Sequence, residues 1–334
     1  MKASLDNPIY SVAIVSASTG TKYTITNALL GCTLSEDEDE IAQKVVLKIA
    51  SIVYDSKYLN SHFKTRDTVY VYANTGDGAK EVFRGYIWTK NVSIGKGRYF
   101  VLTCYDNLIY LQESEIYRYF SKGKSTKSIF STLCSARGIK LTYSHVSMTH
   151  PKLTLRGAMG SIFTNDLLEE VRKNKGKRGI IRSSKGRMYV YTEGKSNSTV
   201  YKLMKGKDGN VYSSEYDETL DGVTTKVTVI TTKDSGKATT KATYKKNTDR
   251  YGTITKVLTS SSDNLSDTKK EAKQIIKDDS SAKITRKIKA VDNPWIRKGD
   301  KVYVDDGEMT GYASVVNISH DALNKNMSLE VRKL

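Results

Sequence analysis

The sequence Gly-Asp-Lys-Val-Tyr-Val at residues 299–304 is followed by a loop, then by Gly-Tyr at 311–312 and Asn-Ile-Ser at 317–319. Valine and tyrosine favour the pleated, half-buried surface of a strand. A polar loop with glycine at its end favours a turn between two strands. The stretch therefore predicts a β-hairpin close to the C-terminus.

The same order of residues occurs earlier in the chain. Residues 66–71 read Arg-Asp-Thr-Val-Tyr-Val, and after a loop come Gly-Tyr at 85–86 and Asn-Val-Ser at 91–93. In both copies six positions separate the glycine from the asparagine, and only the loop between the halves differs in length. Because loops tolerate such differences best, we interpret the pair as an internal repeat. A chance alignment of two hairpins rich in valine, tyrosine and glycine is the alternative. The repeat is defined by Asp67, Gly85, Tyr86, Asn91, Asp300, Gly311, Tyr312 and Asn317.

The composition favours β structure. The chain has 334 residues, which is enough for two or three domains with separate cores. It contains 22 tyrosines but only 6 phenylalanines and 3 prolines, and threonine and serine are abundant. Tyrosine and threonine are enriched in strands, so we expect a mainly β protein.

The order of the predicted elements divides the chain into three parts. Residues 1–115 contain about six or seven short strands, and residues 199–334 return to strands with one inserted helix near 266–278. The number of short strands in the first part is typical of a small barrel or sandwich. Residues 116–198 are expected to be α/β, with a helix capped by Ser125 and a hairpin around Lys185-Gly186.

The net charge of +18 is concentrated in the middle part. Residues 116–198 have 17 basic and 4 acidic side chains, a net of +13, whereas the first part has a net of −1 and the last +6. A concentrated positive field can attract an acidic protein or a nucleic acid, although solvated loops that aid solubility are the plainer interpretation. The candidate contact patch consists of Lys122, Lys124, Lys127, Lys173, Lys175, Lys177 and Arg178.

Residues that could support catalysis or hold a cofactor are missing from the expected patterns. Gly123-Lys124-Ser125 resembles the end of a phosphate-binding loop, but position 118 is an arginine and not the required glycine. The four histidines and three cysteines form no zinc-binding pattern, and we interpret the histidines as isolated surface or loop residues. The cysteines are expected to be buried thiols, and the acidic run 36–40 a solvated turn. We therefore predict no enzyme activity, metal or cofactor.

The sequence resembles the baseplate hub proteins of contractile phage tails and phage-tail-like particles, in particular the XkdQ/YqbQ-like hubs of defective prophages. The resemblance includes Asp-Arg-Tyr-Gly-Thr-Ile at residues 249–254, which is similar to a segment before a helix of the family. It also includes Arg-Lys-Gly-Asp-Lys-Val at 297–302 with the following Gly-Tyr and Asn-Ile-Ser-His. The same resemblance extends to the T-even phage hub and the late-control D family.

The resemblance implies two β-barrels related to the tail tube protein. It also implies a homotrimer in which two barrels from each of three chains imitate a sixfold ring. Such a hub joins the sixfold tube to the threefold spike and contacts tape-measure and baseplate wedge proteins, and nucleic acid at most passes through its channel. No apolar run approaches the ~20 residues of a membrane helix. We therefore expect synthesis in the bacterial cytoplasm and assembly into the baseplate.

Two other functions remain open at this point. The chain could be a cell-wall hydrolase or peptidoglycan-binding component of the same particle, although paired catalytic carboxylates are not evident in the middle part. It could also be a basic nucleic-acid-binding protein, although aromatic residues are not interleaved with the basic ones. The sequence does not distinguish a phage from a headless bacteriocin.

Overall fold

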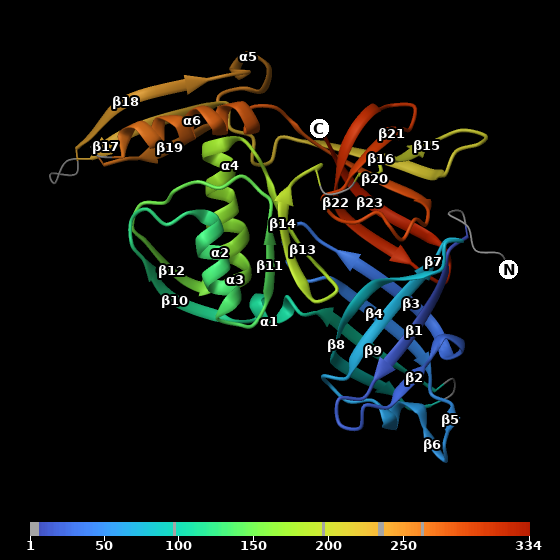
Figure 1. The fold of residues 1–334 in the computed structure, drawn as a ribbon. Coiled ribbons are helices and arrows are strands. Elements are labelled where there is room, and N and C mark those ends of the chain that lie inside the picture. Colours follow the sequence, from blue (N-terminus) through green and yellow to red (C-terminus); the bar gives the residue numbers. More distant parts are fainter. Residues whose placement is uncertain (1–6, 96–97, 196–197, 233–236, 262–263) are drawn as a thin grey trace.

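The computed structural model describes residues 7–95, 98–195, 198–232, 237–261 and 264–334 (Figure 1). The fold is mainly β, with 49% of residues in strands and 18% in helices, which confirms the predicted fold class. Buried apolar side chains form four clusters, one in each of four segments of the fold. The domain boundaries drawn from the sequence remain a prediction.

The first six-stranded unit is built from the N-terminal part of the chain. Its strands lie in the spatial order β1, β7, β8, β9, β4, β3, and all neighbours are antiparallel. Alternate residues of each strand point into a shared apolar core, as the period of two requires. The six strands are β1 Ile9–Val15, β3 Leu29–Glu36, β4 Lys44–Ala50, β7 Thr68–Asn74, β8 Ala79–Ser93 and β9 Tyr99–Asp106. Smaller elements accompany them: β2 Lys22–Thr24, η1 Thr26–Ala28, β5 Val53–Tyr54, β6 Lys57–Tyr58 and η2 Leu59–His62.

The second six-stranded unit has the same layout. Its strands are β15 Tyr201–Met204, β16 Val211–Thr219, β20 Lys283–Val291, β21 Lys301–Asp305, β22 Thr310–Asp321 and β23 Asn326–Lys333. They lie in the spatial order β15, β21, β22, β23, β20, β16. When the six strands of each unit are numbered by their order along the chain, both units have the spatial order 1, 4, 5, 6, 3, 2. The one difference is that β15 runs parallel to β21, whereas β1 runs antiparallel to β7.

Strand β22 joins the two units. Its C-terminal half pairs antiparallel with β3, with Ile318 opposite Glu36 and Asp321 opposite Thr33. The pairing makes one continuous sheet of thirteen strands, and Figure 1 shows the second unit directly above the first. The two units are thus fixed to each other through backbone hydrogen bonds as well as side chains.

The middle segment is α/β, with its own core. Ser125 Oγ accepts the Ser128 N–H at 3.1 Å and caps α2, as expected, and β13 and β14 form the predicted hairpin. Its last long helix continues from a π-helical stretch, η3, into α4. The elements are α1 Ile109–Gln112, β10 Glu115–Phe120, α2 Thr126–Ser135, β11 Lys140–Tyr143, β12 Leu153–Ala158, α3 Met159–Ser161, η3 Ile162–Leu168, α4 Glu169–Lys175, β13 Gly179–Ser184 and β14 Arg187–Thr192.

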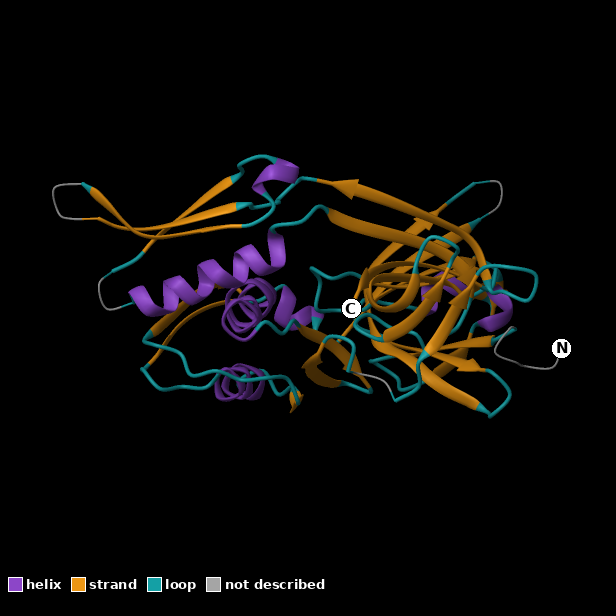
Figure 2. Cartoon of the chain, turned by 90° about the horizontal axis from the view of Figure 1, so that it is seen from above, coloured by secondary structure: helices purple, strands orange, loops and turns teal. Residues whose placement is uncertain are grey.

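A small α/β insertion separates β16 from β20. It comprises β17 Lys226–Thr232, β18 Ala238–Lys245, α5 Thr248–Tyr251, β19 Thr255–Thr259 and α6 Leu265–Asp279. The predicted apolar stripe of α6, namely Ala272, Ile275 and Ile276, packs on Val227 and Val229 of the three-stranded sheet. Figures 1 and 2 show α6 between this sheet and the helices of the middle segment, so the helix belongs to the insertion and not to the second strand unit.

Candidate functional site at the junction of the strand units

The turns before β7 and β21 make the same hydrogen bonds. Asp67 Oδ2 accepts the Lys64 N–H at 2.7 Å, and the Asp67 N–H donates to Lys64 O at 3.2 Å. Asp300 Oδ2 accepts the Arg297 N–H at 2.9 Å, and the Asp300 N–H donates to Arg297 O at 3.1 Å. The residue before each aspartate has a positive φ, 71° and 82°. The two aspartates of the repeat therefore occupy corresponding positions, and Lys64 corresponds to Arg297.

The second halves of the repeat are offset by two residues. The N–H groups of Ile87 and Val315 each donate to the carbonyl oxygen of the repeated aspartate at 3.0 Å, so these two residues correspond. The sequence alignment pairs Gly85 with Gly311, but the hydrogen bonds place Ala313 at that position. Because the side chains of a strand alternate with a period of two, a shift by two residues leaves the apolar pattern unchanged and the sequence cannot reveal it.

The two glycines of the repeat consequently serve different purposes. A Cβ atom on Gly85 would lie 2.1 Å from the carbonyl oxygen of Tyr105, so only glycine fits there. A Cβ atom on Gly311 would meet no atom within 4 Å, but the residue has a φ of +149°. Gly85 permits a close approach of backbones, whereas Gly311 relieves backbone strain.

The repeated tyrosines and asparagines also differ in their surroundings. The Tyr86 ring packs edge-on against Tyr110, and Tyr312 is half exposed beside Tyr303. Asn317 Oδ1 accepts the N–H of Glu38 at 2.7 Å across the junction. Asn91 is exposed on β8, so only the second asparagine connects the two units.

A buried ion pair holds the junction together. The Arg297 guanidinium binds the Glu36 carboxylate at 2.7 and 2.9 Å and also donates to Gln43 Oε1 and Ser183 O. Burial alone would raise the pKa of Glu36, but Arg297 and the nearby Lys298 lower it to about 2. Glu36 was expected in a solvated turn. It is instead buried at the end of β3, because β22 and the turn before β21 cover it.

The turn that contains Arg297 also binds the middle segment. Arg182 donates to Asp300 Oδ1 at 2.9 Å and to Lys298 O at 3.2 Å, and the Tyr191 hydroxyl donates to the same carbonyl at 3.1 Å. The buried Lys298 amine donates to the carbonyl oxygens of Asp37 and Glu40. Three residues of one turn, namely Arg297, Lys298 and Asp300, thus connect both strand units and the middle segment. Sequence reasoning did not identify Glu36, Arg182 or Lys298 as connecting residues.

A second ion-pair group lies at the same junction. Arg332 on β23 binds Glu38 at 2.6 Å and Glu193, after β14, at 2.9 Å. Burial would lower the pKa of Arg332, but the hydrogen bonds that it donates to Glu38 and the charge of that carboxylate raise the pKa. Both carboxylates are therefore paired, which limits relative motion of the first unit, the middle segment and the C-terminal strand.

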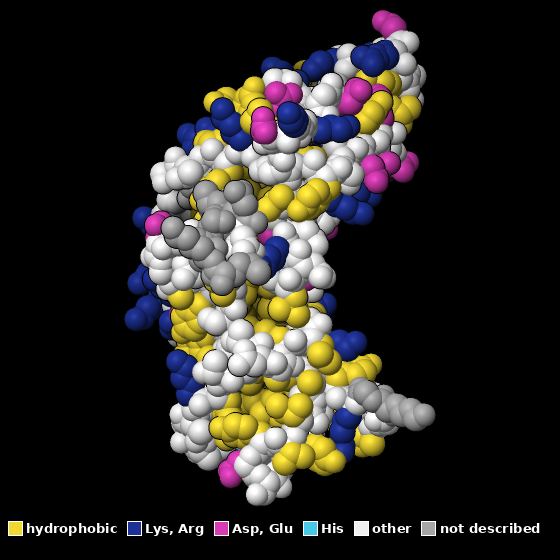
Figure 3. All heavy atoms as spheres, turned by 90° about the vertical axis from the view of Figure 1, so that its right-hand side faces the viewer, with side chains coloured by type: hydrophobic (Ala, Val, Ile, Leu, Met, Phe, Trp, Pro, Cys, Tyr) yellow, Lys and Arg dark blue, Asp and Glu magenta, His cyan; other side chains and the backbone are white. Residues whose placement is uncertain are grey.

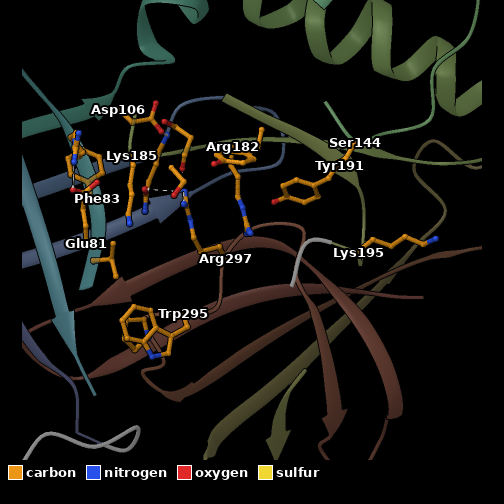
Figure 4. Close-up of a pocket in the computed structure, with 17 residues that line it drawn as sticks. Glu81, Phe83, Asp106, Ser144, Arg182, Lys185, Tyr191, Lys195, Trp295 and Arg297 are labelled. Carbon is orange, nitrogen blue, oxygen red and sulfur yellow. Dashed lines mark hydrogen bonds and ion pairs between the residues drawn. The ribbon is translucent and has the colours of Figure 1, made fainter. Parts of the chain in front are cut away.

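A cavity of about 390 Å³ opens beside the junction (Figure 4). Asp106 at the end of β9 contributes a carboxyl that accepts the N–H groups of Gln43 and Leu108 at 2.9 and 2.8 Å. Burial raises the pKa of Asp106 to about 7. Arg182, Tyr191 and Arg297 line the same cavity. These side chains are already bonded to the protein framework, so the arrangement supports connection of the segments more than chemistry on a substrate.

The seven residues of the candidate basic patch fall into two groups. Lys122, Lys124 and Lys127 are exposed around the start of α2. In the second group Lys173 binds Glu271 of α6 at 3.0 Å, and Arg178 is partly covered, with burial and neighbouring arginines lowering its pKa. Lys175, the last residue of α4, and Lys177 are both exposed. Lys173 is therefore committed to the contact between α4 and α6.

The histidines are predicted to be isolated surface or loop residues. His145 and His150 do lie in loops but are buried, and for His320, which is buried in β22, the prediction is wrong. His145, His150 and His320 are each less than 7% exposed. His150 bonds Glu170 and Thr126, and His320 bonds Asp292 at 2.6 Å, so their ring nitrogens satisfy buried polar groups. The predicted burial of the thiols is confirmed for Cys32, Cys104 and Cys134.

Exposed apolar side chains gather over the first unit. Figure 3 shows apolar side chains on the lower half of the molecule. The exposed apolar residues of this unit include Leu30, Val53, Tyr54 and Tyr58. A contiguous apolar surface of this kind commonly contacts another protein. Within the described ranges no group of three or more potential metal ligands occurs, and no helix is long and apolar enough to cross a membrane.

Known structures share this fold across almost the whole chain. The tail protein from Neisseria meningitidis MC58 is similar with a TM-score of 0.72 and 15% identity over 97% of each chain. The 43 kDa tail protein of prophage MuSo2 from Shewanella oneidensis gives 0.71 and 12% over 98% of each chain. The Escherichia coli c3393 protein, a type VI secretion component, gives 0.56 and 8% over 92% of this chain and 74% of that one.

A family comparison also covers almost the whole chain. No curated protein matches the sequence. A family model described as YQBQ-like, however, matches residues 17–332, which include both strand units, the middle segment and the insertion. The resemblance drawn from residues 249–254 and from the closing strands is thereby confirmed at the level of the family. The chain belongs to the YQBQ-like family.

Proposed function

We propose that the chain is a structural baseplate hub of a contractile tail or tail-like particle. The observation that carries the proposal is the presence of two strand units with the same strand order, joined edge to edge by β22 and β3. Three such chains provide six similar units, which matches a sixfold tail tube above and a threefold spike below. The similar structures support it, because two of them are tail proteins and the Escherichia coli protein is described as similar to tail proteins gp27 and gp5 of bacteriophage T4.

The proposed partners follow from this position. The tail tube protein and the spike would contact the two faces of the ring, and the exposed apolar surface of the first unit suits such a contact. Tape-measure and wedge proteins are candidates for the exposed lysines of the middle segment. In this role the chain is made in the cytoplasm, assembles into the tail and has no catalytic activity.

The mass of the purified protein tests the proposal. A trimer of the 37.3 kDa chain has three times that mass, about 112 kDa, by light scattering or native mass spectrometry. Negative-stain images should show a ring with a central hole. A monomer that stays outside tails when it is produced together with the neighbouring tail proteins would overturn the hub assignment. Clearing of a cell-wall gel by the pure protein would overturn the non-enzymatic role.

A further inference from the structure

The C-terminal half of β22 has partners on both edges, whereas the corresponding half of β8 does not. In β22, residues 318–321 pair with β23 on one side and with β3 on the other. In β8, residues 89–93 pair with β9 on one side. On the other side β7 does not reach them, because its first residue, Thr68, lies opposite Tyr86. Both strands carry a bulge at the same corresponding place, after Ile87 and after Val315. Val92 therefore corresponds to His320, five residues further in each strand.

Strand β16 corresponds in the same way to β3. In the first unit Ile87 pairs with Cys104, Cys104 with Val45, and Val45 with Leu34 across successive strands. In the second unit the corresponding Val315 pairs with Val331, Val331 with Arg286, and Arg286 with Tyr216. Leu34 therefore corresponds to Tyr216. In β3, Leu34 lies opposite His320 of β22. Strand β16 pairs only with β20 among the described residues, so its outer edge is open.

We propose that β8 of one copy pairs antiparallel with β16 of the next copy, with Val92 opposite Tyr216. This contact between copies repeats the contact that β22 and β3 make within one chain. An open strand edge presents unpaired N–H and C=O groups and readily accepts another strand. Val92 and Tyr216 are 37% and 54% exposed in the single chain, so their pairing would also bury apolar surface.

The charges at the two edges fit the same arrangement. Within the chain, Arg297 before β21 binds Glu36 at the end of β3. The corresponding residues are Lys64 before β7 and Glu218, two positions after Tyr216. Both side chains are exposed, and neither forms a hydrogen bond or ion pair with any described residue. In the contact between copies a lysine–glutamate pair would thus correspond to the arginine–glutamate pair within the chain. The basic residue would again come from the unit that contributes β8 or β22, and the glutamate from the unit that contributes β16 or β3.

The proposal rests on the proposed trimer and adds its internal geometry. In a ring of three chains, contacts within a chain and contacts between chains alternate, and each of the six junctions joins one unit to the next. Closure leaves no open β8 or β16 edge, which removes the risk of endless strand pairing. The register is fixed by the bulge, since a slip by one residue would turn every side chain to the wrong face.

Engineered cysteines test the register directly. Directly opposite residues of antiparallel strands have Cα atoms about 4.5–5.5 Å apart, within the reach of a disulfide. The native thiols are buried and should not compete. Mixing Val92→Cys with Tyr216→Cys protein under mild oxidation should give a covalent dimer, and the double variant a covalent trimer. Tyr312→Cys mixed with Tyr216→Cys is the control, because Tyr312 is equally exposed on β22 but away from the junction.

Charge reversal provides a second and independent readout. Lys64→Glu and Glu218→Lys should each weaken self-association by about tenfold through repulsion, and the double variant should restore it. Lys140→Glu makes the same charge change on an exposed residue of the middle segment and should have no effect.

The outcomes separate the register from the hub assignment. If the wild-type protein is trimeric but the cysteine pair links no better than the control, and the double charge reversal restores nothing, the strand pairing is overturned and the trimer stands. If the wild-type protein is monomeric and the cysteines do link, the contact stands and the trimeric hub does not. If neither occurs, both fail.

Discussion

Arg297 and Glu36 form a two-point ion pair although 261 positions separate them in the chain. The arginine lies in the turn before β21, and the glutamate lies at the end of β3, beside the backbone pairing of β3 with β22. The guanidinium also reaches Ser183 in the middle segment. One side chain therefore contacts three segments of the fold and adds to the backbone pairing that joins the two strand units.

Removal of Arg297 should be strongly destabilising. In an Arg297→Met variant the Glu36 carboxylate would stay buried without its partner, which costs about 3–5 kcal/mol of unfolding free energy. Arg297→Lys retains the charge but loses the two-point geometry, so a smaller loss is expected. Urea unfolding followed by circular dichroism measures both. A loss below about 1 kcal/mol for the methionine variant would show that the pair does not hold the junction.

Acid should weaken the same junction. The pKa of Glu36 is about 2 in the folded protein, below the value of about 4.3 expected when unfolded. Its stabilising contribution is therefore complete above about pH 5 and is lost as the pH falls toward 2. Unfolding free energies of the wild type and Glu36→Gln should differ most at pH 6 and converge between pH 4 and 2. A constant difference over this range would contradict the assigned ion pair.

The two glycines of the repeat should respond differently to alanine. Gly85→Ala places a Cβ atom against the Tyr105 carbonyl and should cost about 3 kcal/mol or more, because backbone must move. Gly311→Ala meets open space and should cost about 1 kcal/mol through backbone strain alone. Thermal unfolding of both variants tests the two-residue offset. Equal effects would mean that the glycines are equivalent after all.

Substitutions in the basic patch should separate folding from partner binding. Lys173→Glu would repel Glu271 and loosen the contact of α4 with α6 by at most about 1 kcal/mol. Lys175→Glu with Lys177→Glu changes two exposed residues and should leave unfolding unaltered. If the patch binds an acidic tail protein, this double variant should incorporate poorly into particles. Normal incorporation would remove these two lysines from the candidate patch.

Local features of the fold could be predicted from the sequence. Ser125 precedes residues with helical spacing, and the Lys185-Gly186 turn separates two short strands, so neighbouring residues alone indicate both elements. The repeated aspartates could be found because each accepts the N–H of the residue three positions before it, which is a local interaction. The helix 265–279 has an apolar stripe that the sequence shows directly.

The junction could not be predicted, for a physical reason. Glu36 and Arg297 look like ordinary surface charges until the pairing of β3 with β22 buries them. The offset between Gly85 and Gly311 was hidden because strand patterns repeat every two residues. The sequence predicts that the helix near 266–278 is inserted in the last strand unit. It does not show that α6 packs on its own three-stranded sheet and forms an ion pair with α4.

A density map of the assembled ring tests the central claim most directly. The hub proposal predicts three chains and six strand units around one channel. The sheet should run without interruption from β22 to β3 within each chain and from β8 to β16 between chains, with Lys64 beside Glu218 of the neighbouring copy. A ring of six chains, or three chains whose β8 and β16 edges face solvent, would contradict it.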